Sequence, residues 1–202
     1  MLFVVTGPSG CGKSTILAQL VKDVRSISFS VSHTTRPRRP SEAEGRQYYF
    51  VSETEFKRMI KKDMFLEWAE VHGHCYGTSK REIAARVKEG DVILDVDVQG
   101  ARSIRTLRKD ATFVFVLPPR AADLRKRLLD RGEDDNASIR RRLNNAKREI
   151  REASSFDYVI VNDRLNRAVL ELEAIVLAAR CRAESQAAKI RAVLRSFPAA
   201  KK

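Results

Sequence analysis

The chain has 202 residues, of which 43% are hydrophobic, so a disordered protein is excluded and a single folded domain is expected. No apolar run approaches the ~20 residues of a membrane-spanning helix. A strand-like run directly after Met1 leaves no room for a secretory leader, so we expect a cytoplasmic protein without a membrane partner. The formal net charge of +13 is concentrated in residues 120–151 and 180–202, which indicates a polyanionic partner, either a nucleic acid or small phosphorylated molecules.

Apolar patterning and turn residues predict the elements of the chain in order. The first half is expected to contain a buried strand (2–6), a glycine-rich loop (7–12), a helix (13–24), a strand (27–32), a basic proline-bounded loop (36–40), a strand (48–51), a short helix (53–62), a hairpin (65–79) and a helix (80–89). The second half is expected to contain strands at 92–97, 112–117 and 158–161, basic amphipathic helices at 121–131 and 137–152, and one long helix from 165 onward.

Strands that alternate with helices predict an α/β fold with a parallel five-stranded core sheet. Residues 1–32, 91–119 and 156–202 would form this core within one domain. Two insertions would interrupt it, a mixed α+β segment at 33–90 and a helical segment at 120–155.

The loop between the first strand and the first helix matches the phosphate-binding pattern G-x-x-x-x-G-K-[ST] at every fixed position. It runs Gly7-Pro8-Ser9-Gly10-Cys11-Gly12-Lys13-Ser14. Glycines let backbone N–H groups turn inward around a phosphate chain, Lys13 can reach the terminal phosphates, and Ser14 can ligate Mg²⁺. The expected strand before the loop and helix after it support a P-loop three-layer fold that binds a nucleotide, but they do not select the reaction.

Further motifs along the chain closely resemble those of the guanylate kinase family. The matching residues are Ser32-His33-Thr34-Thr35-Arg36, Arg39, Gly45, Tyr48, Phe50, Glu67-Trp68-Ala69, Tyr76-Gly77-Thr78, Leu94-Asp95, Asp97, Gln99-Gly100, Arg127, Arg131-Gly132, Arg142 and Val159-Ile160-Val161-Asn162-Asp163. The resemblance covers roughly residues 1–180. It implies Mg²⁺-dependent, direct in-line transfer of the γ-phosphoryl group of ATP to GMP in purine nucleotide metabolism, with residues 33–90 as a GMP-binding segment and residues 120–155 as a lid.

The resemblance implies a set of residues that bind GMP. They are Ser32, Arg36, Arg39, Tyr48, Glu67, Tyr76, Thr78 and Asp97. The chemistry agrees, because two arginines can clamp a phosphate bidentately and tyrosine hydroxyls can donate to it. Guanine presents two adjacent donors, and a carboxylate at Glu67, expected to be ionised at neutral pH, accepts from both.

The resemblance also implies the residues for ATP, for catalysis and for the metal. ATP would contact Gly7, Pro8, Ser9, Gly10, Cys11, Gly12, Lys13, Ser14, Thr15, Arg127 and Arg131. The catalytic residues would be Lys13, Arg39, Arg131 and Arg142. Ser14 and Asp95 would hold Mg²⁺, partly through water. Arginines from a closing segment neutralise charge that develops on the transferred phosphoryl group. The separate roles of Asp95 and Asp97 stay open, and structural capping is an alternative for either.

Simpler interpretations apply to several charged or reactive residues. Arg120, Arg125, Arg140 and Arg141 are assigned to a solvated helix face, whereas Arg38 adds a third arginine to the basic loop and leaves open which arginines clamp. The run His72-Gly73-His74-Cys75 lacks further ligands, so no zinc site is expected. Cys11 is either oxidation-sensitive or simply a small loop residue, and the three cysteines fit no disulfide framework.

Three other functions fit part of the sequence less well than the kinase does. A ribose bisphosphate kinase of the same fold would not need Ser32, Glu67 and Thr78, and a non-catalytic guanylate-kinase-like binding domain usually has a degraded phosphate loop. A nucleic-acid-binding protein would explain the charge but not the GMP clamp, so nucleic acid is not expected as a partner. The sequence leaves open whether the chain is a monomer or a homo-oligomer and what the basic tail from residue 182 does.

Overall fold

A parallel five-stranded sheet forms the centre of the computed structural model, which describes residues 1–40, 42–71, 73–130 and 135–197. Its strands are β1 (Leu2–Thr6), β2 (Ile27–Phe29), β7 (Asp91–Asp95), β8 (Thr112–Leu117) and β9 (Tyr158–Val161), in the order β2-β7-β1-β8-β9. The central strand β1 pairs Phe3 with Ile93 on one side and with Thr112 on the other. The predicted parallel core sheet is therefore confirmed.

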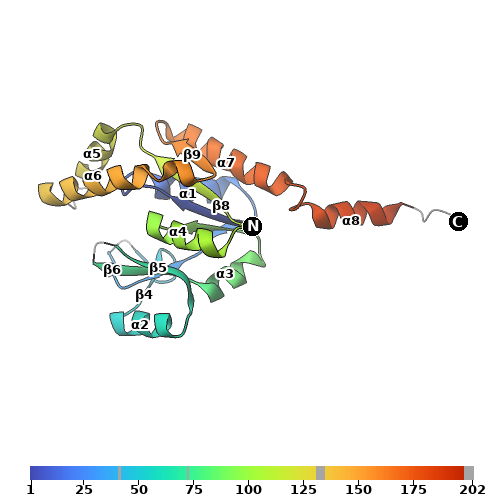
Figure 1. Ribbon diagram of the computed structural model, residues 1–202, viewed down its shortest axis with the longest axis horizontal. Coiled ribbons are helices and arrows are strands. Elements are labelled where there is room, and N and C mark those ends of the chain that lie inside the picture. The colour runs from blue at the N-terminus through green and yellow to red at the C-terminus, as the bar shows by residue number, and fades with distance from the viewer. Residues whose placement is uncertain (41, 72, 131–134, 198–202) are drawn as a thin grey trace.

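Helices cover both faces of this sheet and give three layers (Figure 1). Helices α1 (Lys13–Asp23) and α7 (Leu165–Cys181) pack on the face that carries Phe3 and Val5. Helices α3 (Lys80–Val87) and α4 (Val98–Leu107) pack on the face that carries Leu2 and Val4. Successive side chains of a strand alternate between faces, so the unbroken apolar run of β1 supplies both cores. Each fully buried side chain contributes about 1.5–3 kcal/mol to folding.

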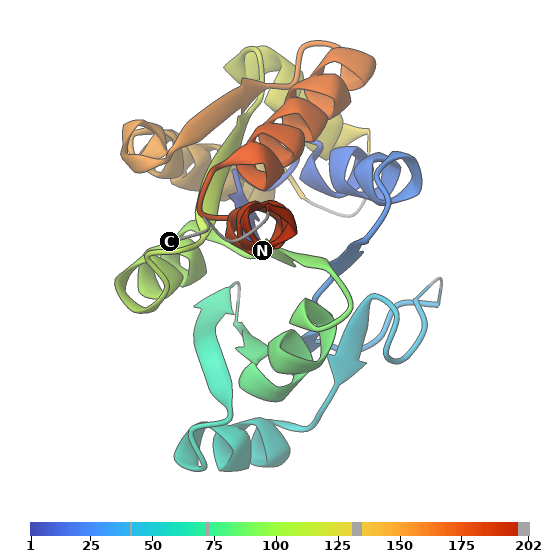
Figure 2. The ribbon, with the colours of Figure 1, turned by 90° about the vertical axis from the view of Figure 1, so that its right-hand side faces the viewer.

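A second, mixed sheet lies at one end of the core sheet (Figure 2). It contains β3 (Ser32–Thr34), β4 (Tyr48–Phe50), β5 (Phe65–Val71) and β6 (His74–Ser79), in the order β4-β3-β6-β5. Strands β5 and β6 form the predicted antiparallel hairpin. Helix α2 (Glu53–Lys61) begins at Ser52, whose hydroxyl accepts from the Glu55 amide as in a capping box, and packs Phe56 on Phe65 with ring centroids 4.5 Å apart.

Helices α5 (Ala121–Leu129) and α6 (Asn136–Ile150) form a projecting pair with its own small core. That core contains Leu124, Leu128, Ile139 and Ala146. A 3₁₀ turn at Ala153–Ser155 leads from α6 to β9. Within the described residues, no helix is long and apolar enough to cross a membrane.

The predicted strand at 27–32 is wrong, because the segment is divided between the two sheets. Residues Ile27–Phe29 pair with β7 of the core sheet, whereas Ser32–Thr34 pair with β4 and β6 of the second sheet. The Ser30 amide still donates to the Ile93 carbonyl, and the chain crosses from one sheet to the other directly after this bond. An apolar run shows that a segment is buried but not which sheet buries it.

The single long helix predicted from 165 is also wrong, since the chain forms α7 and a separate helix α8 (Ala187–Ser196). Side chains of the connection cap the end of α7: the Ser185 hydroxyl donates to the Ala179 carbonyl and Gln186 Nε2 to the Arg180 carbonyl. These bonds satisfy carbonyls that a helix leaves without partners at its end, and they stop the helix where the local composition alone favours continuation.

Candidate active site

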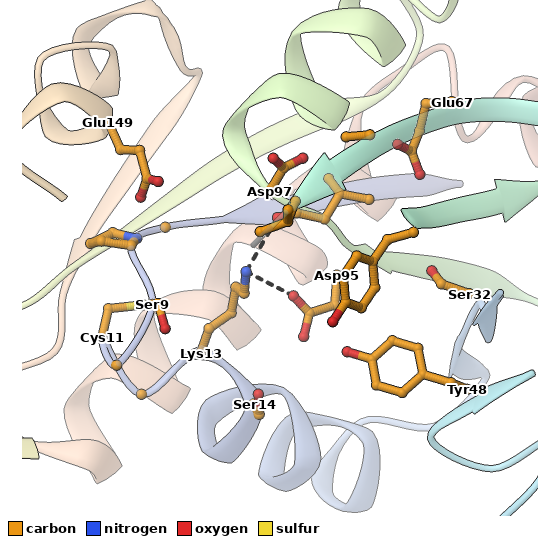
Figure 3. Close-up of a pocket in the computed structure, with 18 residues that line it drawn as sticks. Ser9, Cys11, Lys13, Ser14, Ser32, Tyr48, Glu67, Asp95, Asp97 and Glu149 are labelled. Carbon is orange, nitrogen blue, oxygen red and sulfur yellow. Dashed lines mark hydrogen bonds and ion pairs between the residues drawn. The ribbon is translucent and has the colours of Figure 1, made fainter. Parts of the chain in front are cut away.

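A cavity of about 270 Å³ opens where the carboxyl ends of β1 and β7 face the second sheet (Figure 3). Its lining comes from the phosphate loop, from β3 to β6, from the end of β7 and from α6. The lining residues are Gly7, Pro8, Ser9, Gly10, Cys11, Gly12, Lys13, Ser14, Ser32, Tyr48, Glu67, Ala69, Val71, Tyr76, Asp95, Val96, Asp97 and Glu149. Ligands of open α/β sheets bind at this end of the strands.

The phosphate loop is held from behind by two side chains that are distant in sequence. Asn162 Nδ2 and Arg127 Nη1 each donate to the Cys11 carbonyl at 2.8 Å, and Arg127 Nη2 donates to the Asn162 carbonyl at 3.0 Å. Gly12 has φ 93°, and a Cβ there would stand 2.2 Å from Asn162 Nδ2, so only glycine lets the loop close on its support. Arg127 thus contacts loop backbone in this structure rather than lining the cavity.

Lys13 is tied to the end of β7. Its Nζ forms an ion pair with Asp95 Oδ1 at 2.8 Å and donates to the Val96 carbonyl at 3.2 Å, as the dashed lines of Figure 3 show. Burial of the ammonium opposes its charge, but interactions with Asp95, and further ones with Cys11 and Tyr48, outweigh burial, so the pKa of Lys13 is raised and the amine stays protonated. A fixed positive charge therefore stands at the mouth of the phosphate loop.

Cys11 lies buried in the phosphate loop with 1% of its surface exposed. Burial raises the pKa of its thiol, although the Lys13 charge acts in the opposite direction. A buried, protonated thiol is a poor nucleophile and a poor target for oxidation, which favours the small-residue interpretation.

The basic loop places Arg36 against two aromatic rings. Arg36 Nη2 pairs with Glu42 Oε1 at 2.7 Å, and its guanidinium lies 5.5 Å from the ring centroid of Tyr48. The Tyr48 and Tyr76 rings meet edge to face at 5.7 Å, and burial with the nearby Asp95 charge raises the pKa of Tyr48 to about 12. The tyrosine hydroxyl therefore remains a hydrogen-bond donor over the whole physiological range.

Arg38 and Arg39 of this loop are exposed, and all three arginines, Arg36 included, lie outside the cavity lining. The Arg39 amide donates to Glu42 Oε2 at 2.9 Å, and Arg38 Nη1 donates to the Glu42 carbonyl at 3.2 Å. Glu42 thus organises the loop, while the guanidinium of Arg36 lies against the ring of Tyr48.

The far end of the cavity is built around Glu67, of which only 7% is exposed. The fully buried Thr78 donates its hydroxyl to Glu67 Oε1, and Ser32 lines the cavity on the neighbouring strand. Burial raises the pKa of Glu67 to about 7, with a further contribution from the Asp97 charge and an opposing one from the Thr78 hydrogen bond. The carboxyl is therefore about half protonated at neutral pH, which corrects the expectation of a fully ionised group.

Asp97 serves as the N-cap of α4, because its Oδ1 accepts from the Gly100 amide at 2.8 Å. It also lines the cavity, so one side chain both caps the helix and faces the cavity. Gly100 allows this packing, since a Cβ there would stand 2.7 Å from Glu67 Oε2. Asp95, the last residue of β7, faces Lys13 instead.

The helical pair reaches the phosphate loop through α6. Arg142 Nη1 lies 3.4 Å from the Ser9 hydroxyl, and Glu149, two turns further along the same helix face, lines the cavity. Burial and the Asp97 charge raise the pKa of Glu149. Arg131 lies outside the described residues.

The oxygen ligands near Lys13 fit a hard cation such as Mg²⁺. The Ser14 hydroxyl and the Asp95 carboxylate both line the cavity, and Mg²⁺ bound with nucleotide phosphates keeps water in most remaining positions. Among the described residues, no group of three or more His, Cys, Asp or Glu could by itself hold a metal. Of the His-Gly-His-Cys run, His72 lies outside the described residues, while His74 and Cys75 lie on β6.

The structure brings most of the expected site residues into one cavity and leaves others at its edge. Thr78 lies directly behind Glu67, whereas Thr15 is exposed and lies outside the lining. Sequence analysis missed Glu42, Glu149 and the support role of Asn162. The seven-residue spacing from Arg142 to Glu149 places both on one helix face and could have indicated Glu149.

Comparisons with known proteins point to one family. The family model for guanylate kinase matches residues 1–179. The guanylate kinase of Symbiobacterium thermophilum is 50% identical over 183 residues, which cover 90% of this chain and 87% of that protein. The guanylate kinase of Thermotoga maritima is 44% identical over 190 residues, covering 94% and 92% respectively. The crystal structure of guanylate kinase from Anaplasma phagocytophilum superimposes with a TM-score of 0.74 at 31% identity, over 90% of this chain and 87% of that one.

Proposed function

The chain belongs to the guanylate kinase family of nucleoside monophosphate kinases, and we propose that it transfers the γ-phosphoryl group of ATP to GMP, yielding ADP and GDP. One observation carries this proposal. The phosphate loop with Lys13 and the buried Glu67–Thr78 pair face the same cavity from opposite ends, which suits a donor phosphate chain at one end and a purine base at the other.

On the donor side, the proposal assigns ATP to residues 7–15. Inward-facing amides of the loop would surround the phosphates, and Lys13 would exchange Asp95 for the terminal phosphates. Arg127 and Asn162 would act on ATP through the loop backbone that they support. Arg127 would contribute through these backbone contacts in the arrangement seen here. Arg131 is also expected to contact ATP, and it lies outside the described residues.

On the acceptor side, the proposal assigns the GMP phosphate to Arg36, Arg39, Tyr48 and Tyr76. Arg36 and the two tyrosines already converge, and Arg36 would leave Glu42 for a phosphate that carries more charge. Arg39, exposed in this structure, would swing inward as the segment at 33–90 closes.

The base would be read at the far end of the cavity. Ionised Glu67 would accept from the ring N–H and the exocyclic amine of guanine, with Thr78 holding the carboxylate in place and Ser32 and Asp97 alongside. Adenine presents an acceptor at the corresponding ring nitrogen, so an ionised Glu67 would repel it.

Mg²⁺, with the Ser14 hydroxyl and the Asp95 carboxylate as its protein contacts, would supply charge neutralisation on the donor phosphates. Release of Lys13 from its ion pair frees the Asp95 carboxylate for that contact. The catalytic contribution of this chain is then positioning and charge. Lys13, Arg39, Arg131 and Arg142 would surround the transferred group, and the lid at 120–155 would close to exclude water.

A coupled assay of the purified protein with ATP and a panel of acceptors tests the proposal. GMP should be phosphorylated at least about 100-fold more efficiently than AMP or UMP, and a ribose bisphosphate should not be a substrate. Preference for AMP, UMP or the ribose bisphosphate, or absence of turnover with every acceptor, would refute it.

A further inference from the structure

Glu149 is the one carboxyl of the cavity lining, among the described residues, to which the proposed reaction gives no role. It lies half-buried on α6 and lines the cavity together with the phosphate loop and Asp97. Figure 3 shows its carboxylate pointing into the cavity from the side opposite Tyr48. Within the part of the chain that the structure describes, no side chain forms a hydrogen bond or an ion pair with Glu149. The cavity therefore contains a hydrogen-bond acceptor that lacks a donor.

The surroundings of Glu149 leave its negative charge uncompensated. Burial raises the pKa of Glu149, and the nearby Asp97 charge raises it further, whereas the Lys13 charge acts in the opposite direction. Lys13 cannot serve as its partner, because the Lys13 ammonium pairs with Asp95 at 2.8 Å. An acceptor that is partly buried without a donor is unfavourable for folding, and such groups are typical of ligand sites, where the bound molecule supplies the donor.

The chemistry of a nucleoside monophosphate shows which of its parts can donate to this carboxylate. The phosphate carries negative charge and would repel it, and the proposed phosphate positions lie at the cationic groups Lys13 and Arg36. The base is assigned to the buried Glu67–Thr78 pair at the far end of the cavity. Two adjacent ribose hydroxyls remain, and they lie between the base and the phosphate. An acidic residue that accepts from ribose hydroxyls is a recurrent arrangement in nucleotide-binding proteins.

The position of Glu149 along α6 places it on the acceptor side of the cavity. Arg142, two turns earlier on the same helix face, approaches the Ser9 hydroxyl of the phosphate loop at 3.4 Å. Seven residues of helix separate the two side chains by about 10 Å. Glu149 instead lies near Asp97, whose charge acts on Glu149 and also on Glu67. Asp97 thus stands between Glu149 and the base end of the cavity, as Figure 3 shows.

We propose that Glu149 binds the ribose of the acceptor nucleotide, with its carboxylate accepting from the 2′- and 3′-hydroxyls. This contact rests on the proposed function, because it takes GMP as the acceptor, but binding of GMP can be measured without phosphoryl transfer. The same helix would then hold the acceptor ribose through Glu149 and approach the donor phosphates through Arg142. Binding of the acceptor would in this way favour the closed position of the lid.

Isothermal titration calorimetry of the full chain with GMP and with 2′,3′-dideoxy-GMP tests the contact. Removal of both hydroxyls should weaken binding to the wild type about tenfold or more, because hydrogen bonds to a charged acceptor are lost. Glu149→Ala should bind GMP about tenfold more weakly than the wild type does and should discriminate between the two ligands less than about twofold. Equal discrimination by the wild type and Glu149→Ala would overturn the proposal.

Steady-state kinetics with the same two acceptors distinguish failure of this contact from failure of the proposed function. If GMP is phosphorylated but discrimination does not depend on Glu149, the ribose contact is refuted and the proposed function stands. If discrimination in binding depends on Glu149 but no acceptor is turned over, the proposed function is refuted and the ribose contact stands. Absence of GMP binding to the wild type would overturn both.

A second donor nucleotide separates the acceptor ribose from the donor ribose. The change from ATP to 2′-deoxy-ATP should affect kcat/KM equally in the wild type and in Glu149→Ala. A loss with 2′-deoxy-ATP that disappears in Glu149→Ala would overturn the proposal and assign Glu149 to the donor.

Two further variants control for charge and for folding. Glu70→Ala removes an exposed carboxylate outside the cavity lining and should discriminate between the two acceptors as the wild type does. If Glu149→Ala proves unstable, Glu149→Gln replaces it, because the amide keeps the size of the side chain. A neutral acceptor forms a weaker hydrogen bond, so Glu149→Gln should bind GMP about threefold or more weakly than the wild type. Unchanged GMP binding by Glu149→Gln would overturn the proposal.

Discussion

Replacement of Glu67 by Gln keeps the size and shape of the side chain but removes the ionisable group at the base end of the cavity. The amide retains one acceptor, which can still receive the Thr78 hydroxyl, and gains a donor. That donor faces one of the two guanine donors whichever way the amide is turned. Hydrogen bonds to charged groups contribute ~1.5–3 kcal/mol, so kcat/KM for GMP should fall roughly 10- to 150-fold. AMP should not suffer this loss, and the preference for GMP over AMP should shrink.

The pH dependence of the same variant tests the protonation state. With the pKa of Glu67 raised to about 7 by burial and Asp97, the ionised fraction rises from about a tenth at pH 6 to about nine tenths at pH 8. The pH dependence of kcat/KM reflects ionisation of the free enzyme. From pH 6 to pH 8, kcat/KM for GMP should therefore rise roughly ninefold more in the wild type than in Glu67→Gln. Titration of the GMP phosphate affects both proteins equally and cancels in their ratio.

The raised pKa also has a consequence for folding. The native protein holds the Glu67 proton up to about pH 7, whereas the unfolded chain releases it near pH 4.5. The native state therefore binds more protons between these values, and the contribution of Glu67 to the free energy of unfolding falls as pH rises through this window, by roughly 3 kcal/mol in total. Glu67→Gln should accordingly gain stability relative to the wild type between pH 4.5 and pH 8.

Two experiments measure these effects. Steady-state kinetics with GMP and AMP at several pH values give the base preference and the pH dependence of kcat/KM. Chemical denaturation at the same pH values gives the change in the free energy of unfolding. Glu70→Gln on the exposed face of the same strand is the control and should change none of them. An unchanged GMP-to-AMP ratio in Glu67→Gln would show that this residue does not read the base. If kcat/KM for GMP depends on pH in the same way in Glu67→Gln and in the wild type, then the titration of Glu67 does not cause the pH dependence.

Three other substitutions address separate parts of the site. Lys13→Ala removes the charge at the phosphate loop and should lower kcat at least about 100-fold with little change in melting temperature; more than about a tenth of wild-type activity would contradict its role. Arg127→Ala removes the support of the phosphate loop and should lower the free energy of unfolding by roughly 2 kcal/mol, or ~4–8 °C in melting temperature. It should also raise the KM for ATP. Arg125→Ala, at an exposed position of the same helix, is the control and should change neither quantity. Gly100→Ala places a Cβ 2.7 Å from Glu67 Oε2, so kcat/KM for GMP should fall about tenfold or more while the KM for ATP stays constant; an equal change in both would refute a selective effect on the base.

Local sequence determined much of this protein, because some features need only neighbouring residues. The phosphate loop requires glycines at fixed spacing between a strand and a helix, and a buried parallel strand appears as an unbroken apolar run such as Leu2–Thr6. The capping box at Ser52 and the hairpin at 65–79 likewise follow from short-range patterns. These elements, and the cavity residues that follow from the family motifs, could therefore be predicted.

Tertiary structure alone decided the features that depend on residues far apart in the chain. Whether Ser28 and Ser32 belong to one sheet or to two depends on their partners in β7 and β4, which the apolar run at 27–32 does not encode. The position of Arg127 is set by Cys11 and Asn162, 116 and 35 residues away, so an arginine expected on phosphate is found on backbone carbonyls. The raised pKa of Glu67 also depends on residues far apart in the chain. Burial raises it, and the carboxyl is buried only once the second sheet packs against the end of β7.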